Sequence, residues 1–216
     1  MNDKLVIFGG TGGLGKLITP LLEPDFDVIP LGSTHVQVEN EDSIKQFFDQ
    51  SRYVPNIIYM AVRNIDAVLH KLNAVDLAYQ LNTNVEGFLN VLKYGLSAMR
   101  ANSYGRIIYV SSILSDRPIP GTGIYAATKA FNDNVVRTCA LENAKYNITC
   151  NSIQLGYFNA GLSAKVPKDV MVKVLDKIPV RRLGNGEDLN KVIRFILDAP
   201  YLTGVNLRYD GGLLLT

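Results

Sequence analysis

The stretch GGTGGLG, residues 9–15, directly follows the apolar run LVIF. A glycine-rich turn between a strand and a helix lets backbone N–H groups surround an anion, and the helix N-terminus adds a favourable field. Three dinucleotide-binding spacings fit these five glycines: Gly10, Gly12 and Gly15; Gly9, Gly13 and Gly15; or Gly9, Gly12 and Gly15. A P-loop is excluded, because Leu17 stands where that motif needs Ser or Thr. Taken alone, the turn could equally be an ordinary flexible loop or a binding site for a pyrophosphate, and the rest of the chain must decide between them.

Short apolar runs alternate with helical patterns along the chain. Seven runs are typical of strands: 4–10, 27–31, 36–38, 56–62, 105–112, 148–156 and 204–212. Helical spacing of apolar residues covers 43–50, about 75–99 and about 125–143. This alternation predicts an α/β Rossmann fold, in which helices cover both faces of a doubly wound parallel sheet of about seven strands. Ligands of such sheets bind at the carboxyl ends of the strands.

Composition limits the kinds of protein that this chain can be. With 216 residues and 47% hydrophobic content, we expect one core and a single domain over 1–216. The net charge of +2 and the scattered basic residues argue against nucleic-acid and membrane partners. Strand-like sequence begins by Lys4 and no apolar run has membrane-spanning length, so we expect a cytoplasmic protein. The two cysteines and two histidines lack metal-ligand spacing, and we expect no metal site.

The segment 105–131 holds the most informative polar spacing. Tyr125 and Lys129 are four residues apart, which places them on one face of a helix. An ammonium beside a phenol favours the phenolate and lowers its pKa, so the pair could form a tuned general acid. Ser112, at the end of a predicted strand, could hydrogen-bond a substrate carbonyl, and the Asn84 amide could hold a water behind the lysine. Taken singly, Ser112 could equally be a turn residue and Asn84 a buried structural amide.

Together these motifs resemble the short-chain dehydrogenases/reductases over nearly the whole chain. The glycine turn, Asn84-x-x-Gly87, Ser111-Ser112, Tyr125-x-x-x-Lys129 and the tail TGVNLRYDGG follow the order and spacing of that family. Residues 155–167 and 178–189 look most like the 3-oxoacyl-(acyl-carrier-protein) reductases. The resemblance implies a catalytic tetrad of Asn84, Ser112, Tyr125 and Lys129. It also favours the glycine register of Gly9, Gly13 and Gly15, without excluding Gly12 from close approach.

The implied cofactor is NADP, with NADPH preferred over NADH, because residues 31–34 contain no carboxylate that would repel a phosphate and Ser33 and Thr34 could donate to it. The expected cofactor contacts are Gly9, Thr11, Gly12, Gly13, Leu14, Gly15, Ser33, Thr34, Gln37, Val38, Ala61, Tyr125, Lys129, Gly156 and Phe158.

Several positions depart from the family pattern, and all of them are positions where the family contacts its cofactor. Only GSTH, residues 32–35, joins the second predicted strand to the third, so the helix usual between them is expected to be deleted. The family's Asp-Val appears as Gln37-Val38, its Asn-Asn-Ala-Gly as residues 59–62, and its Pro-Gly as Leu155-Gly156. Ala160 replaces a threonine that commonly fixes the nicotinamide amide. The proton-transfer residues are complete.

The resemblance implies a ketoreductase that transfers hydride to a carbonyl, with Tyr125 as the proton donor. The substrate could be a 3-oxoacyl thioester, free or on an acyl carrier protein, or a sugar, polyketide or other secondary-metabolite ketone. Four arginines could meet an acidic carrier: Arg117, Arg137, Arg181 and Arg182. We also expect a homodimer or homotetramer, because the helices around 84–99 and 125–143 carry apolar residues on more than one face. The alternative from another class is a non-catalytic dinucleotide sensor or scaffold on the same fold.

Overall fold

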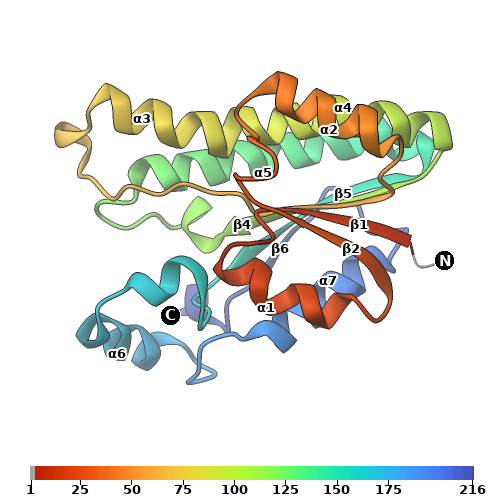
Figure 1. Cartoon of the computed structure of the whole chain (residues 1–216). Coiled ribbons are helices and arrows are strands. Elements are labelled where there is room, and N and C mark those ends of the chain that lie inside the picture. The colour runs from red at the N-terminus through yellow and green to blue at the C-terminus, as the bar shows by residue number, and fades with distance from the viewer. Residues whose placement is uncertain (1–2) are drawn as a thin grey trace.

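The computed structural model describes residues 3–216, in which a parallel sheet lies between two layers of helices (Figure 1). Its strand order is β2-β1-β3-β4-β5-β6, and every neighbouring pair is parallel. The strands are β1 (Asp3–Phe8), β2 (Phe26–Leu31), β3 (Asn56–Tyr59), β4 (Gly105–Ser112), β5 (Ile148–Leu155) and β6 (Asn206–Tyr209). This arrangement confirms the predicted Rossmann-type sheet.

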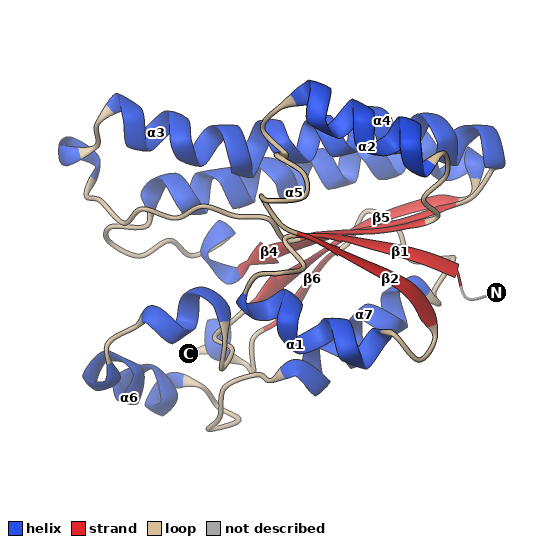
Figure 2. Ribbon diagram, in the orientation of Figure 1, coloured by secondary structure: helices blue, strands red, loops and turns tan. Residues whose placement is uncertain are grey.

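The helices cover the two faces of the sheet (Figure 2). One layer holds α2 (Glu41–Ser51), α3 (Ala74–Leu81), α4 (Gly87–Asn102) and α5 (Gly123–Asn143). The other layer holds α1 (Gly13–Leu22), α6 (Lys168–Lys177) and α7 (Gly186–Leu197). Short 3₁₀ turns occur at Leu69–Lys71, Ile113–Ser115, Ala144–Tyr146, Gly161–Lys165 and Leu213–Leu215. Within residues 3–216, no helix combines the length and apolar character needed to cross a membrane.

The hydrophobic core is split by the sheet into two clusters, because successive side chains of a strand point to opposite faces. In β1, Val6 and Phe8 belong to the cluster beneath α2, α4 and α5, whereas Leu5 and Ile7 belong to the cluster beneath α1 and α7. All eight residues of β4 and of β5 are buried. Burial on both faces explains why these strands are continuous apolar runs in the sequence rather than alternating ones.

The sheet has six strands where about seven are expected, because residues 36–38 form no strand. His35 and Val36 donate their backbone N–H groups to the Gly32 carbonyl in a turn, and Gln37 donates to the Ser43 hydroxyl. The Val38 carbonyl accepts from the Asn90 side chain. Residues 32–35 contain no helix, as expected, but because residues 36–38 form no strand, β2 and β3 are connected by helix α2. As a result β2 is an edge strand, where the proline that it contains is tolerated.

The long helical segment predicted around 75–99 is divided by a π-helical turn. This turn, Asn82–Glu86, lies between α3 and α4 and contains Asn84. Single π turns inside α-helices frequently occur at functional sites. The apolar periodicity continues across the turn, which is why the sequence predicts one helix.

The glycine turn brings β1 and α1 into close contact. Gly9 has a φ of +87°, a conformation that side chains other than glycine rarely adopt. A Cβ on Gly15 would overlap the carbonyl oxygen of Gly10, so the first turn of α1 packs directly on the backbone of the preceding loop. A Cβ on Gly12, by contrast, would meet only the Gly9 oxygen, at 3.1 Å.

We expect Gly15→Ala to destabilise the protein by about 1–3 kcal/mol, because the added methyl group must displace backbone rather than a flexible side chain. Gly12→Ala is the matched control and should cost about 1 kcal/mol less than Gly15→Ala. Urea unfolding at fixed pH measures both free energies. Equal losses in the two variants would show that α1 does not depend on this contact.

Candidate active site

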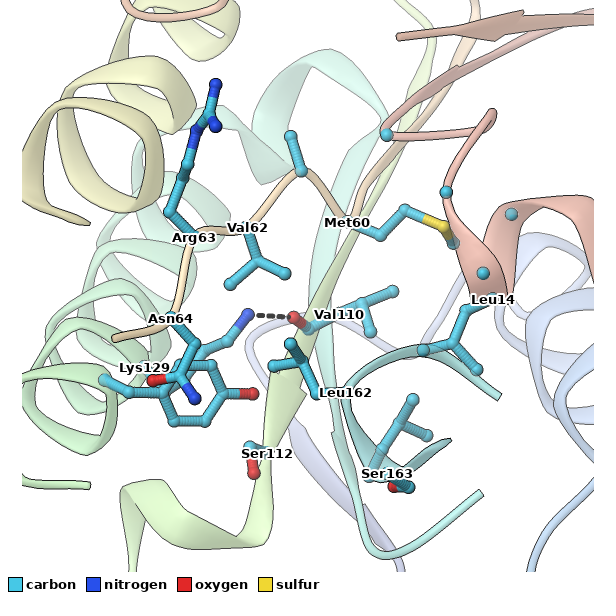
Figure 3. Close-up of a pocket in the computed structure, with 18 of the residues that line it drawn as sticks. Leu14, Met60, Val62, Arg63, Asn64, Val110, Ser112, Lys129, Leu162 and Ser163 are labelled. Atoms are coloured by element: carbon cyan, nitrogen blue, oxygen red, sulfur yellow. Dashed lines mark hydrogen bonds between the residues drawn. The ribbon is translucent and has the colours of Figure 1, made fainter. Parts of the chain in front are cut away.

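A cavity of about 600 Å³ runs along the carboxyl ends of the strands, as predicted for this sheet. In Figure 3, Leu14 of the glycine turn lies on one side of this cavity, and Ser112 and Lys129 lie on the other. The expected site residues that line it are Gly9, Thr11, Gly12, Gly13, Leu14, Gly15, Ser33, Val38, Ala61, Ser112, Tyr125, Lys129, Gly156 and Phe158. Segments far apart in the sequence thus contribute to one continuous wall.

Three of the expected site residues, Thr34, Gln37 and Asn84, are not part of this wall. The Thr34 side chain is exposed, with Oγ1 3.4 Å from His35 Nδ1. Gln37 is also exposed, in the loop that replaces the expected third strand. The loss of that strand moves the edge of the cavity to Ser33 and Val38.

The glycine-turn end of the cavity has the features that suit a dinucleotide. Helix α1 begins at Gly13, and its N-cap Gly12 has no side chain to accept the N–H groups of the first turn. A Cβ on Gly13 would come within 2.7 Å of the Gly161 nitrogen. The backbone of the glycine turn therefore lies so close to the backbone at Gly161 that no side chain fits at position 13. Such free N–H groups at a helix N-terminus favour a pyrophosphate. The residues present therefore fit this part of a dinucleotide cofactor.

The other end of the cavity brings together Ser112, Tyr125 and Lys129. All three are buried, and they come from the end of β4 and from one face of α5. Lys129 Nζ donates to the Val110 carbonyl at 2.7 Å (Figure 3) and lies 5.6 Å from the centre of the Tyr125 ring. Hydroxyl, phenol and amine thus converge on the same part of the wall, as the sequence predicts.

Burial dominates the acid–base properties of this end. It raises the pKa of Tyr125 to about 12, although a hydrogen bond with Ser112 acts in the opposite direction. The expectation that a neighbouring ammonium gives this phenol a lowered pKa is therefore wrong, because burial raises that pKa instead. Burial also lowers the pKa of Lys129 to about 7, against the charge of Asp133. Near neutral pH, Lys129 consequently changes its charge readily.

Asn84 lies behind the cavity and connects the elements around it. Its Oδ1 accepts from the Arg63 backbone at 2.8 Å, and its Nδ2 donates to the Arg63 carbonyl at 2.8 Å and to Thr128 Oγ1 at 3.2 Å. The Thr128 hydroxyl in turn donates to the Tyr125 carbonyl. These bonds use both donors of the amide and link the 60–73 loop to α5. The expected water on this amide stays a prediction.

Several residues in the wall were not expected from the sequence, among them Glu39, Arg63, Asp66, Leu162 and Lys165. They lie in loops and in the turn 161–165, where no regular apolar pattern fixes the direction of a side chain. Arg63 is held by the ring of Tyr79, with its guanidinium carbon 4.3 Å from the ring centre. Within residues 3–216, no three His, Cys, Asp or Glu side chains gather in a way that could hold a metal ion.

Known proteins resemble this chain over its full length. A family model described as Enoyl-(Acyl carrier protein) reductase matches residues 24–214. Carbonyl reductase family member 4 of Xenopus tropicalis is 27% identical over 100% of this chain and 99% of that protein. The 3-oxoacyl-[acyl-carrier-protein] reductase of Bos taurus is 26% identical over 100% of both chains.

A similarity of structure extends these matches. The solved structure titled "ElxO with NADP Bound" covers 100% of both chains with a TM-score of 0.88 and 23% sequence identity, a likeness that establishes the fold. The family match, the parallel sheet and the cavity at its carboxyl edge agree. The chain belongs to the short-chain dehydrogenase/reductase family, whose oxidoreductases act on hydroxyl and carbonyl groups.

Proposed function

We propose that this protein is an NADPH-dependent ketoreductase in which Tyr125 donates the proton to the carbonyl oxygen. One observation carries the proposal: Ser112, Tyr125 and Lys129 line one end of a cavity whose other end is the glycine turn. The glycine turn would hold the pyrophosphate of the cofactor, and the wall would lead from there to the three polar side chains. The name of the NADP-bound structural neighbour supports this choice of cofactor.

Each polar group has a distinct role in the proposed reaction. Bound NADPH supplies the hydride. The Ser112 hydroxyl donates a hydrogen bond to the carbonyl oxygen and orients it, and the Tyr125 phenol transfers its proton to that oxygen as negative charge develops. The Lys129 ammonium stabilises the phenolate left on Tyr125 and binds the cofactor ribose. Donors that are already in place stabilise the transition state more than the ground state.

The proposed substrate is a ketone with an apolar chain, such as a 3-oxoacyl thioester. Leu114, Ile119, Leu162 and Val166 line the cavity together with Ser112. Relatives named 3-oxoacyl-[acyl-carrier-protein] reductase support a thioester, whereas a secondary-metabolite ketone fits the same apolar wall. An acyl carrier protein is not required by this proposal.

The four arginines considered for carrier docking already have partners in this chain. Arg117 donates to the Thr216 carbonyl and Arg137 to the Asn134 side chain. Arg181 and Arg182 pair with the Asp176 and Asp188 carboxylates, respectively. These contacts favour a free substrate over one presented by a docked acidic protein.

We extend the proposal to a cytoplasmic, single-domain enzyme that works as a homodimer or homotetramer. Leu89 on α4, and Phe131 and Leu141 on α5, are exposed apolar side chains. A second copy of this chain would cover such side chains and remove their apolar surface from water.

Tyr125→Phe removes the proposed proton donor and keeps the ring. The catalytic constant for ketone reduction should fall by about 10²–10⁴-fold, the usual contribution of a positioned general acid. NADPH affinity should change little, because the glycine turn remains intact. A turnover assay and a fluorescence titration with NADPH measure the two quantities. Wild-type turnover in the variant would contradict the mechanism, and a wild type that binds NADPH but reduces no ketone in a broad panel would favour the sensor.

The pH dependence of the reaction should follow Lys129, whose pKa is lowered to about 7. Because the charged ammonium is the active form, kcat/KM for NADPH, which reports groups of the free enzyme, should fall as pH rises above about 7. The limiting decrease is about tenfold per pH unit. Returning each sample to pH 6.5 and recovering the activity separates this titration from denaturation. A flat profile up to pH 9 would remove Lys129 from the proposed role.

NADPH should be the better cofactor, because Ser33 lies in the cavity wall and residues 31–34 carry no carboxylate. Ser33→Ala should reduce kcat/KM for NADPH by about tenfold, as for loss of a hydrogen bond to a charged group, and leave the value for NADH unchanged. Thr34→Ala is the matched control, because the Thr34 side chain lies outside the wall. Equal use of both cofactors by the wild type would show that this edge does not recognise the phosphate.

A further inference from the structure

Helix α5 buries a carboxylate one turn beyond Lys129. Asp133 follows Lys129 by four residues, so both side chains lie on the same face of the helix. Each is only 3% exposed, in the layer between α5 and the sheet. The described function of the site makes no use of this carboxylate.

Asp133 has few partners for a buried charge. Its Oδ2 accepts from Gln154 Nε2 at 3.0 Å, and its Oδ1 has no hydrogen-bond partner within residues 3–216. Over the same residues, no lysine or arginine lies within 4.0 Å, the limit for an ion pair. A buried carboxylate without a compensating charge is costly, so a more distant counter-charge is needed.

Lys129 is the buried cation on the same helix face. Its ammonium has three donors, and its hydrogen bond within the described part of the chain goes to the Val110 carbonyl at 2.7 Å. It also lies 4.7 Å from the centre of the Tyr109 ring. Burial lowers the pKa of Lys129, and the charge of Asp133 acts against that decrease. The charge of Asp133 therefore offsets part of the burial cost of the Lys129 ammonium.

The other titratable groups near this layer cannot take the place of Asp133. Asp66 is exposed, and Asp116 is half-exposed and paired with Arg208 at 3.2 Å. The titratable groups that face this layer are Tyr109 on β4, Tyr125, Asp133 and Cys139 on α5, and Cys150 on β5. Three more face it from the surrounding segments: Asp66 in the 60–73 loop, Asp116 after β4 and Arg208 on β6. Asp133 is the buried carboxylate among them.

We infer that Asp133 is a positioning residue whose buried carboxylate keeps the Lys129 side chain charged and directed at the Val110 carbonyl. The Asp133 carboxylate and the Lys129 ammonium do not form a contact ion pair. Their attraction therefore favours the charged form of Lys129 but leaves the ammonium near Tyr125, because it does not pull the side chain along the helix toward Asp133. Two opposite charges that are separated by more than the ion-pair limit of 4.0 Å attract each other more strongly in a protein interior than in water. The use of this charge in catalysis rests on the proposed function, whereas the coupling of the two side chains does not.

Gln154 on β5 holds the carboxylate in this place. Its Nε2 lies within hydrogen-bonding distance of Ser115 Oγ at 2.9 Å, Asp116 Oδ1 at 3.1 Å and Asp133 Oδ2 at 3.0 Å. Ser115 Oγ also donates to the Ser112 carbonyl. The same amide thus connects Asp133 to the end of β4, where the reacting carbonyl would bind.

The coupling is tested first by unfolding, without cofactor or substrate. A double-mutant cycle compares the wild type, Asp133→Asn, Lys129→Met and the double variant by urea unfolding at pH 7. We expect a coupling of about tenfold in the unfolding constant, because each single variant leaves one buried charge uncompensated. Asp116→Asn, which alters a half-exposed acceptor of the same Gln154 amide, is the control and should be additive with Lys129→Met. If the effects of Asp133→Asn and Lys129→Met on the free energy of unfolding are additive as well, the inference is overturned.

The second test is the pH profile. Asp133→Asn should shift the basic limb of kcat/KM for NADPH by at least about one unit toward lower pH, because removal of the negative charge lowers the pKa of Lys129. Asp116→Asn should leave the basic limb of the pH profile unchanged. Asp133→Glu, which keeps the negative charge, should give a basic limb close to that of the wild type. If Asp133→Asn does not fold, Asp133→Ser removes the charge without adding volume.

The two tests separate the inference from the proposed function. Coupling in the cycle together with a wild type that lacks turnover would support the charge pair and reject the ketoreductase. Normal turnover with an unshifted limb and an additive cycle would reject the charge pair and leave the ketoreductase standing.

Discussion

The packing of α5 on β4 and β5 is the contact on which the candidate site depends. It buries a row of polar side chains, Tyr125, Lys129 and Asp133, beside strands that are themselves fully buried. The same contact raises the pKa of the phenol and lowers that of the amine, because both charged forms lose water. A site of this kind needs compensating hydrogen bonds, and the Val110 carbonyl and the Gln154 amide supply them to Lys129 and Asp133, respectively.

Asn84 and Thr128 show how backbone and side chains share this task. The Asn84 amide joins the Arg63 backbone to Thr128, and the Thr128 hydroxyl bonds to the Tyr125 carbonyl. The π turn at Asn82–Glu86 positions that amide between the 60–73 loop and α5. Asn84 therefore contributes to the site by fixing the surroundings of the tyrosine, at a place where it does not line the cavity.

The glycine-turn end of the cavity differs more from the expected family pattern than the end with Ser112, Tyr125 and Lys129 does. Without a strand at residues 36–38, β2 becomes the edge of the sheet and a loop lies where the third strand was expected. The glycine turn is independent of that edge, because it is fixed by β1, α1 and the backbone of residues 161–165. Changes at one end are thus compatible with a complete set of polar groups at the other.

The sequence alone determines the alternation of strands and helices, the glycine turn and the spacing of Tyr125 and Lys129, because each depends on local periodicity. It also predicts that Ser112 and the glycines lie along the same edge of the sheet, because parallel strands all end there. Tertiary structure decides that residues 36–38 leave the sheet, that both donors of the Asn84 amide bond to protein acceptors, and that burial raises the pKa of Tyr125. It likewise places Asp133 against Gln154. These outcomes depend on which distant segment forms each hydrogen bond and on how completely that segment excludes water from the side chain. Neither can be predicted from a local sequence pattern.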